Sequence, residues 1–173
     1  HMNVLRSALY VLWLSVTVVP YAIAVLTLSI FVRGDRLYWF TAGWLRLATW
    51  GSKVICGVRH RIHGWENLPD SAVILCPKHQ STWETFAFPT LMPKPLCYVF
   101  KRELLLIPFF GWAMGRLDMI HIDRSQRSKA FNRVVAQGKD LLAQGIWIIM
   151  FPEGTRIPRG QKGNYKSGGT RLA

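Results

Sequence analysis

The 173-residue sequence has few acidic residues and a low overall share of charge. Nine Asp and Glu stand against 22 Lys and Arg, so the formal net charge is +13. Such an excess favours an anionic partner, either a nucleic acid or the anionic face of a membrane. Charged residues make up only 18% of the chain while half of it is apolar, which is unusual for a freely soluble domain. Composition alone does not separate the two kinds of partner.

Cysteine is also scarce, and its spacing excludes two common roles. Cys56, Cys76 and Cys97 include no Cys-x-x-Cys pair, so neither a zinc cluster nor a disulfide framework is predicted. Cys76 and Cys97 lie in apolar, strand-like runs, and we expect both to be small core residues. Unpaired cysteines indicate a reducing compartment, so we expect the part of the chain after its apolar N-terminus to face the cytoplasm.

One long run without charged side chains extends from Ala8 to Val32. As a helix rising ~1.5 Å per residue, it is long enough to cover the ~30 Å hydrocarbon core of a bilayer. We interpret it as membrane-embedded and expect Pro20 to kink or divide it. A signal peptide is disfavoured, because the run is too long and no small-residue cleavage site follows it.

A second helix is predicted after the polar turn at residues 33–36. Apolar side chains recur at three- and four-residue steps from Leu37 to Ile55, while Arg46 and Lys53 lie on another face. This pattern indicates an amphipathic helix with tryptophans at the lipid boundary. Residues 1–58 are therefore expected to form a membrane-anchoring helical hairpin, which either spans the bilayer or dips into one leaflet.

From residue 59 onward, short apolar runs alternate with helix-like segments. Strands are expected at residues 72–76, 96–100, 119–122 and 146–151, and a helix capped by Ser125 is expected at residues 126–144. The alternation predicts an α/β fold with a mixed, largely parallel sheet flanked by helices. The segment 158–169 is rich in Gly, Lys and Arg and is expected to be a mobile loop.

Polar clusters follow two of these strands directly. His79 and Glu84 come after residues 72–76, and the segment Phe151–Arg156 comes after the last strand. If the strands are parallel, both clusters lie at the sheet edge where open α/β sheets bind ligands. A third cluster begins at Lys101, at the end of another strand, and by itself it is typical of a solvated charge run.

The first cluster suits acid–base chemistry. With His79 outside a helix and Glu84 in its first turns, the carboxylate can hold one imidazole nitrogen while the other takes a proton from a hydroxyl. Taken alone, however, the pair is explained better as a helix cap in which Glu84 complements the helix dipole. In Phe151–Arg156, the glycine, the hydroxyl and the Arg156 guanidinium suit a phosphate or an oxyanion. A surface salt bridge is an equal alternative for Arg156.

Together and in this order, the three clusters resemble the motifs of the glycerolipid acyltransferase family, particularly its bacterial 1-acylglycerol-3-phosphate (lysophosphatidic acid) acyltransferases. Residues 78–84 match the motif Asn-His-x-x-x-x-Asp, with Lys78 in place of Asn and Glu84 in place of Asp. The motif Lys-x-Glu-Leu…Pro…Gly is matched by Lys101, Glu103, Leu104, Pro108 and Gly111. Phe-Pro-Glu-Gly-Thr-Arg is matched without a change by Phe151–Arg156.

The resemblance implies transfer of a fatty acyl group from a thioester, on coenzyme A or acyl carrier protein, to the sn-2 hydroxyl of 1-acyl-glycerol-3-phosphate. The product would be phosphatidic acid for phospholipid biosynthesis. His79 would be the base and Glu84 would orient it. The acceptor's phosphate would be held by Lys101, Arg156, Glu153, Gly154 and Thr155. On this reading the reaction requires no metal, no other cofactor and no covalent acyl-enzyme.

The resemblance also implies partners and a location. We expect contacts with membrane lipids, lysophosphatidic acid and the thioester donor at the inner (cytoplasmic) membrane, with a catalytic domain at residues 59–173. The family's fourth motif, an apolar strand with a proline, follows the region matching residues 165–173, so this domain is expected to be truncated at its C-terminus. Two alternatives remain, namely another acceptor (a lyso-aminolipid or glycerol 3-phosphate) and a non-catalytic lipid-binding protein. Nucleic acid is not expected, because most tryptophans lie in apolar segments rather than among basic residues.

Overall fold

Four short strands organise the chain in the computed structural model, which describes residues 2–173, with Arg127 described by its backbone only. The strands are β1 (Ile74–Leu75), β2 (Leu96–Lys101), β3 (Ile120–Ile122) and β4 (Trp147–Ile149). They form one sheet in the order β1-β4-β2-β3, and the pairings β1–β4, β4–β2 and β2–β3 are all parallel. The expected α/β sheet is therefore confirmed, although the described strands form a purely parallel sheet rather than a mixed one.

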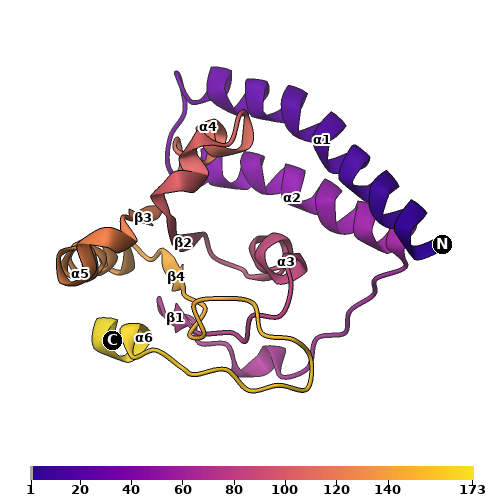
Figure 1. The fold of residues 1–173 in the computed structure, drawn as a ribbon. Coiled ribbons are helices and arrows are strands. Elements are labelled where there is room, and N and C mark those ends of the chain that lie inside the picture. Colours follow the sequence, from indigo (N-terminus) through magenta and orange to yellow (C-terminus); the bar gives the residue numbers. More distant parts are fainter. Residues whose placement is uncertain (1) are drawn as a thin grey trace.

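Helices precede the sheet and connect its strands (Figure 1). The α-helices are α1 (Met2–Leu28), α2 (Asp35–Cys56), α3 (Trp83–Leu91), α4 (Phe110–Met114), α5 (Arg127–Ala143) and α6 (Gly168–Leu172). Three short 3₁₀ turns are η1 (Trp65–Asn67), η2 (Arg102–Leu106) and η3 (Arg124–Gln126). In Figure 1, α3 and α5 lie on opposite sides of the sheet.

Side chains alternate between the two faces of the sheet, as expected for extended strands. On the face covered by α5 and α6, Cys97 and Ile148 pack in one buried cluster with Val134 and Leu172. On the other face, Leu96 and Trp147 pack in a second cluster with Tyr38 of α2, and partly buried side chains of α3 join them. The sheet is thus covered on both faces, as continuous apolar strands require.

The first two helices form a hairpin that is held by hydrogen bonds as well as by packing (Figure 1). Tyr10 donates to the carbonyl of Ala48 at 2.8 Å, and Trp13 donates to Leu47 at 3.0 Å. Pro20 was expected to kink or divide the first helix; α1 runs through this residue, so Pro20 does not divide it. α1 starts at Met2, six residues before Ala8, where the charge-free run begins.

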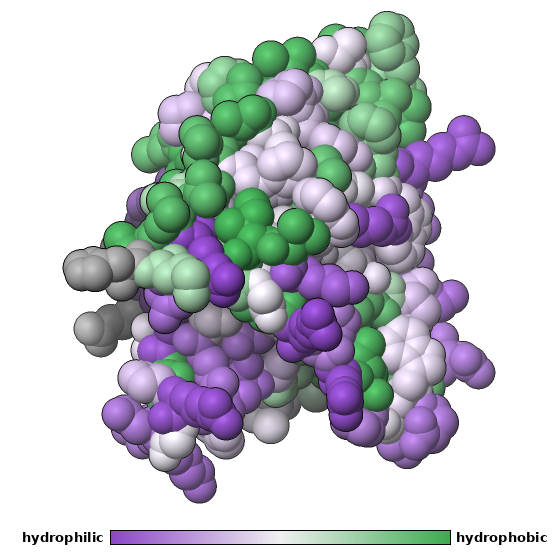
Figure 2. Space-filling view, turned by 90° about the vertical axis from the view of Figure 1, so that its right-hand side faces the viewer, coloured by the Kyte–Doolittle hydropathy of each residue, from purple (hydrophilic) through white to green (hydrophobic). Residues whose placement is uncertain are grey.

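One helix among residues 2–173, α1, is long and apolar enough to cross a membrane, and only 11% of its most apolar stretch is buried. A core helix of a soluble protein would bury that surface. Val4, Leu5 and Val11 are each at least 60% exposed. Figure 2 shows apolar side chains gathered over the upper part of the molecule and hydrophilic ones over the lower part. Exposed apolar surface on this scale marks a partner or a membrane contact.

Two local predictions about the chain were wrong. Cys76 is exposed rather than buried, because β1 ends before it. Ser125 does not cap α5; its hydroxyl and its N–H donate to the Asp123 carboxylate at 2.6 and 3.0 Å. That pair of hydrogen bonds, with smaller contributions from nearby arginines, lowers the pKa of Asp123.

Candidate active site

The polar clusters predicted from the sequence lie at one edge of the sheet. Because all four strands are parallel, their carboxyl ends point the same way. His79 follows β1, Lys101 ends β2, and the turn Phe151–Arg156 follows β4, which pairs with both strands. This edge is where open α/β sheets bind ligands.

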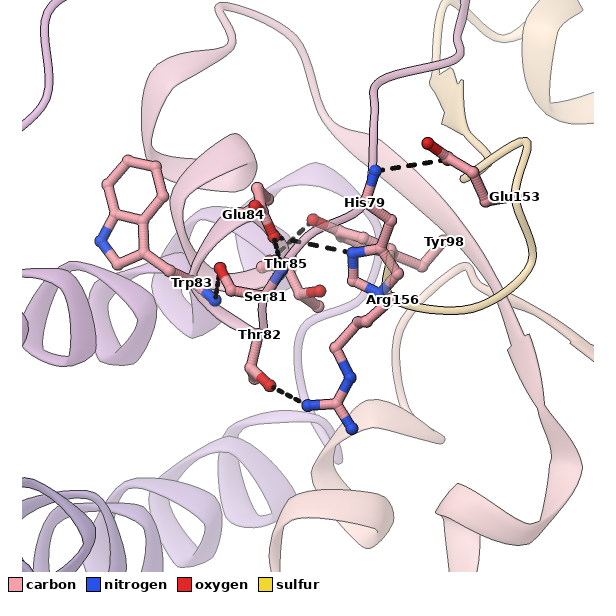
Figure 3. A network of polar contacts seen from close by, with 9 residues as sticks. All are labelled: His79, Ser81, Thr82, Trp83, Glu84, Thr85, Tyr98, Glu153 and Arg156. Atoms are coloured by element: carbon pink, nitrogen blue, oxygen red, sulfur yellow. Dashed lines mark hydrogen bonds and ion pairs between the residues drawn. The ribbon is translucent and has the colours of Figure 1, made fainter. Parts of the chain in front are cut away.

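His79 and Glu84 approach each other as the sequence predicts. The His79 Nδ1 atom lies 3.6 Å from Glu84 Oε2, and the two side chains are 16% and 18% exposed (Figure 3). This distance is slightly too long for a hydrogen bond, and Nδ1 is buried with no other partner within residues 2–173. Catalytic contacts are often long before substrate binds. With Nδ1 enclosed beside the carboxylate, Nε2 is the nitrogen left to meet a substrate.

Glu84 also makes a capping contact at the start of α3, which was the other explanation that the sequence offered for this residue. Its Oε2 accepts the N–H of Ser81 at 2.9 Å, and the hydroxyl of Ser81 accepts the N–H of Trp83 at 3.2 Å. His79 takes no part in this cap, since the residue at the N-cap is Thr82 and no side-chain cap bond is present there. Helix capping therefore explains the position of the Glu84 carboxylate but not the position of the His79 imidazole.

Residues that follow β4 contact the N–H, the carbonyl and the ring of His79. The N–H of His79 donates to Glu153 Oε2 at 3.3 Å, and its carbonyl accepts the N–H of Ile157 at 2.9 Å. The imidazole stacks on the ring of Phe151, with centroids 4.0 Å apart and an angle of 22° between planes. Backbone and ring of the candidate base are thus both positioned by this one turn, which sequence reasoning did not anticipate.

Glu153 contacts the candidate base rather than a cation. It is 4% exposed, and its second oxygen, Oε1, is buried without a hydrogen-bond partner among the described residues. The sequence comparison with the family placed Glu153 among the phosphate ligands. A buried carboxylate repels a phosphate, so the observed contacts favour a positioning role instead.

Arg156 lies on the α3 side of the same edge. Its guanidinium donates to the Thr82 hydroxyl at 3.0 Å, and the side chain is otherwise exposed (Figure 3). Thr82 is the N-cap residue of α3, where the helix dipole favours an anion. Arg156 therefore adds a fork of donors at a helix terminus that already attracts negative charge.

The remaining predicted phosphate ligands lie nearby with more open surroundings. Lys101 is exposed at the carboxyl end of β2, and Thr155 is exposed in the turn. Gly154 has φ +67°, and a Cβ there would lie 2.9 Å from Lys166 Nζ. This left-handed backbone conformation favours glycine.

The glycine of the second motif has a packing role. A Cβ on Gly111 would lie 2.3 Å from the Leu104 carbonyl oxygen and 2.7 Å from the backbone of Leu105. Gly111 therefore lets α4 sit directly on η2, the segment that follows Lys101.

An apolar cavity of about 140 Å³ lies between the hairpin and the α3 face of the sheet. Tyr98 and Phe100 line it from β2, Thr85 and Phe86 from α3, and most of the rest comes from the hairpin, η2 and α4. Tyr98 donates to the Thr85 carbonyl at 2.7 Å, and burial raises the pKa of this phenol well above its usual range. The cavity therefore keeps a neutral, apolar lining that suits hydrocarbon.

Other catalytic chemistries find little support among the described residues. Burial raises the pKa of the Cys97 thiol to about 12 and also raises that of Cys76, which disfavours the reactive thiolate. No group of three His, Cys, Asp or Glu side chains within residues 2–173 is arranged to hold a metal ion.

A model of the acyltransferase family matches residues 59–173, which are more than half of the chain. The sequence is 42% identical, over 98% of its length, to a 1-acyl-sn-glycerol-3-phosphate acyltransferase of Pseudomonas aeruginosa. It is 29% identical, over 88% of its length, to a protein of the same name from Saccharomyces cerevisiae. The chain spans 66% of the first relative's length and 49% of the second's.

A solved structure has the same fold. The crystal structure of the 1-acyl-sn-glycerophosphate (LPA) acyltransferase from Thermotoga maritima matches with a TM-score of 0.73 at 21% sequence identity. The match covers 99% of this chain and 68% of that one. Hairpin, sheet and flanking helices thus occur together in that protein as they do here.

Proposed function

The chain belongs to the acyltransferase family, and we propose that it transfers a fatty acyl group from a thioester to the sn-2 hydroxyl of 1-acyl-glycerol-3-phosphate, forming phosphatidic acid. The observation that carries the proposal is the His79–Glu84 contact at the strand-end edge, 3.6 Å between Nδ1 and Oε2. The names of relatives from bacteria, yeast and animals support this acceptor.

In the proposed reaction, His79 is the general base. Its Nε2 takes the proton of the acceptor hydroxyl while that oxygen attacks the thioester carbonyl. The carbon–sulfur bond then breaks, and the leaving thiolate takes the proton back from the imidazolium, so that His79 ends neutral. Glu84 holds Nδ1–H and stabilises the imidazolium. The step uses no cofactor, and a positioned base of this kind contributes ~10²–10⁴ in rate.

For the acceptor's phosphate we propose Arg156, Lys101 and the N–H groups at the start of α3, with Gly154 and Thr155 forming the turn beside them. Two observations support Arg156: its donors are exposed, and its partner Thr82 lies at the N-terminus of α3. Arginine and a helix N-terminus both suit phosphate oxygens. The apolar cavity supports a substrate with a fatty acyl chain.

We propose further that the protein acts at the inner membrane with its active site on the cytoplasmic side. The exposed apolar surface of α1 supports membrane association, and three free cysteines support a reducing compartment. Anionic lipids of the cytoplasmic leaflet attract a chain with a net charge of +13.

The direct test is an activity assay on the full-length protein in detergent. Lysophosphatidic acid and palmitoyl-coenzyme A are supplied, and the products are identified by mass spectrometry. Phosphatidic acid should accumulate with the protein and not without it. Parallel assays with glycerol 3-phosphate and a lyso-aminolipid test the acceptor. Preferred acylation of either would replace the proposed acceptor, and no acylation of any of the three would overturn the proposed activity.

A further inference from the structure

A hydrogen bond joins the hairpin to the helix that carries Glu84. Trp83, the first residue of α3, donates from its indole Nε1 to the hydroxyl of Ser52 in α2 at 3.2 Å. Ser52 is 3% exposed, and its hydroxyl donates in turn to the Thr49 carbonyl at 2.7 Å. The indole of Trp83 therefore meets an acceptor that is itself held in place inside the hairpin.

From Trp83, further contacts lead to the candidate base. The N–H of Trp83 donates to the Ser81 hydroxyl at 3.2 Å, and the N–H of Ser81 donates to Glu84 Oε2 at 2.9 Å. The same oxygen lies 3.6 Å from His79 Nδ1. Figure 3 shows the Trp83 side chain pointing away from His79 while Glu84 lies toward it. A continuous series of contacts thus connects the hairpin with the imidazole.

The direction of the Trp83 side chain sets the direction of Glu84. Successive side chains of an α-helix lie ~100° apart about its axis, since each turn holds 3.6 residues. A rotation of α3 that freed Trp83 from Ser52 would therefore turn Glu84 away from His79 by the same angle. The N-cap residue of α3, Thr82, makes no cap bond with its side chain, so the start of this helix depends on the contacts around it.

Aromatic packing holds α3 against the hairpin but fixes its rotation less well. Phe86 of α3 meets Trp44 of α2 edge-on, with centroids 5.6 Å apart. His60, which follows the hairpin, lies with its ring centroid 5.3 Å from that of Trp83. Aromatic pairs accept a range of distances and angles, whereas a hydrogen bond weakens steeply away from its preferred angle. The bond from Trp83 to the hairpin is therefore the directional contact at this end of α3.

We propose that Ser52 and Trp83 are positioning residues, whose hydrogen bond fixes the rotation of α3 so that the Glu84 carboxylate faces His79. This inference rests on the proposed function, in which Glu84 holds the base. Both residues act through Glu84 and touch no reacting group. The hairpin then belongs to the catalytic unit, because a displacement of α2 against α3 reaches the base through this bond.

The kinetic test removes the hydrogen bond from either side. Ser52→Ala removes the acceptor, and Trp83→Phe removes the donor. Each should lower kcat for phosphatidic acid formation about 5- to 20-fold, because a shift of ~1 Å at a reacting group costs up to ~10² in rate. The KM for lysophosphatidic acid should stay within about twofold of wild type, since the contact between Arg156 and Thr82 is kept. The double variant should lose little more than either single variant, because both changes remove the same bond.

Thr17→Val is the matched control. The Thr17 hydroxyl in α1 accepts the Nε1–H of Trp44 at 3.0 Å and donates to the Trp13 carbonyl at 2.8 Å. This variant therefore loses the same kind of bond as Ser52→Ala, but no contact that leads to Glu84. Both variants should lower the midpoint of thermal unfolding by a similar amount, whereas Thr17→Val should keep the kcat of wild type.

A chemical measurement tests the same contact without turnover. Diethylpyrocarbonate modifies an unprotonated imidazole nitrogen, and a carboxylate beside Nδ1 favours the tautomer whose Nε2 is free. The tryptic peptide that begins at His79 contains no other histidine, so mass spectrometry of this peptide reports His79 alone. Modification should be slower in Ser52→Ala and in Trp83→Phe, as in Glu84→Ala, and unchanged in Thr17→Val.

Two kinetic results would overturn the inference. Wild-type kcat in both Ser52→Ala and Trp83→Phe would mean that their hydrogen bond does not position Glu84. An equal loss of kcat in Thr17→Val would mean that the stability of the hairpin alone is responsible. If the wild-type protein transferred no acyl group, the proposed function would fail, and the rates of His79 modification would still decide the inference. Slower modification in both variants would support it, and rates equal to that of wild type would refute it.

Discussion

Glu153 offers the sharpest test of how the candidate base is held. The substitution Glu153→Ala removes the buried carboxylate that accepts the His79 N–H at 3.3 Å. A buried N–H left without an acceptor costs ~1–3 kcal/mol. The loop can relieve that cost by moving, but a shift of ~1 Å at a reacting group costs up to ~10² in rate.

We therefore expect Glu153→Ala to lower kcat for phosphatidic acid formation about 10- to 100-fold with little change in the KM for lysophosphatidic acid. Glu153→Gln keeps a side-chain carbonyl as acceptor, and its kcat should stay within about fivefold of wild type, since a neutral acceptor is about half as strong as a charged one. The midpoint of thermal unfolding should fall by about 2–4 °C for each kcal/mol lost.

Steady-state kinetics with the acceptor concentration varied separate the two roles of Glu153, and circular dichroism checks that both variants are folded. If Glu153→Ala raised the KM for lysophosphatidic acid and left kcat unchanged, Glu153 would be part of the phosphate pocket. Wild-type kinetics in Glu153→Ala would mean that the contact to His79 does not position the base.

Three further predictions use other parts of the structure. Arg156→Ala should raise the KM for lysophosphatidic acid by about tenfold, because a charge-assisted phosphate contact is lost, and an unchanged KM would place the phosphate elsewhere. Iodoacetamide at pH 8 should alkylate Cys76 and spare Cys97 in the folded protein. The Cys97 thiol, with its pKa raised to about 12, stays protonated until far more alkaline pH. Mass spectrometry of tryptic peptides reports the modified sites, and modification of Cys97 would contradict its burial. Replacing the exposed Leu5, Leu9 and Leu12 of α1 by Lys should weaken sedimentation with vesicles at high salt, and undiminished sedimentation would show that this surface does not carry the membrane contact.

Deleting the whole helical hairpin would not test membrane binding alone, because α2 also packs against the core. Tyr38 of α2 is 7% exposed and packs in the cluster that covers one face of the sheet. Trp44 stacks edge-on against Phe86 of α3 at 5.6 Å. Removal of residues 2–58 would expose this core, so loss of folding would be mixed with loss of membrane binding.

The elements of the fold were predictable where local pattern decides them. The strand containing Cys97 was expected at residues 96–100 and lies at Leu96–Lys101, and the helix expected at residues 126–144 lies at Arg127–Ala143. The short helices α4 and α6 were missed, since five residues carry too little periodicity. The segment expected to be a loop at residues 158–169 leads into α6 and is tied to Pro152 by the N–H of Lys166 at 2.8 Å. Hydrogen bonds between residues far apart in the chain leave no pattern in the local sequence.

In the candidate site, too, contacts set by local sequence were predictable and long-range contacts were not. The sequence placed His79 and Glu84 within reach of each other, because the histidine comes before a helix and the carboxylate lies in its first turns. It also placed the turn Phe151–Arg156 beside them, because parallel strands end at a common edge. It did not reveal that Phe151 stacks on the imidazole or that Glu153 holds its backbone, because these contacts depend on β4 pairing with β1 in the sheet. The resemblance to the family placed Glu153 among the phosphate-binding residues, whereas its burial and its contact with the His79 N–H support a proposed positioning role.

The turnover of a His79→Ala variant is the most direct test of the catalytic assignment. Purified wild-type and variant proteins are compared in detergent with saturating lysophosphatidic acid and palmitoyl-coenzyme A, and phosphatidic acid is quantified by mass spectrometry. Loss of the base should lower kcat by ~10²–10⁴ in a protein that remains folded by circular dichroism. Turnover equal to that of wild type would contradict the assignment of His79 as the catalytic base.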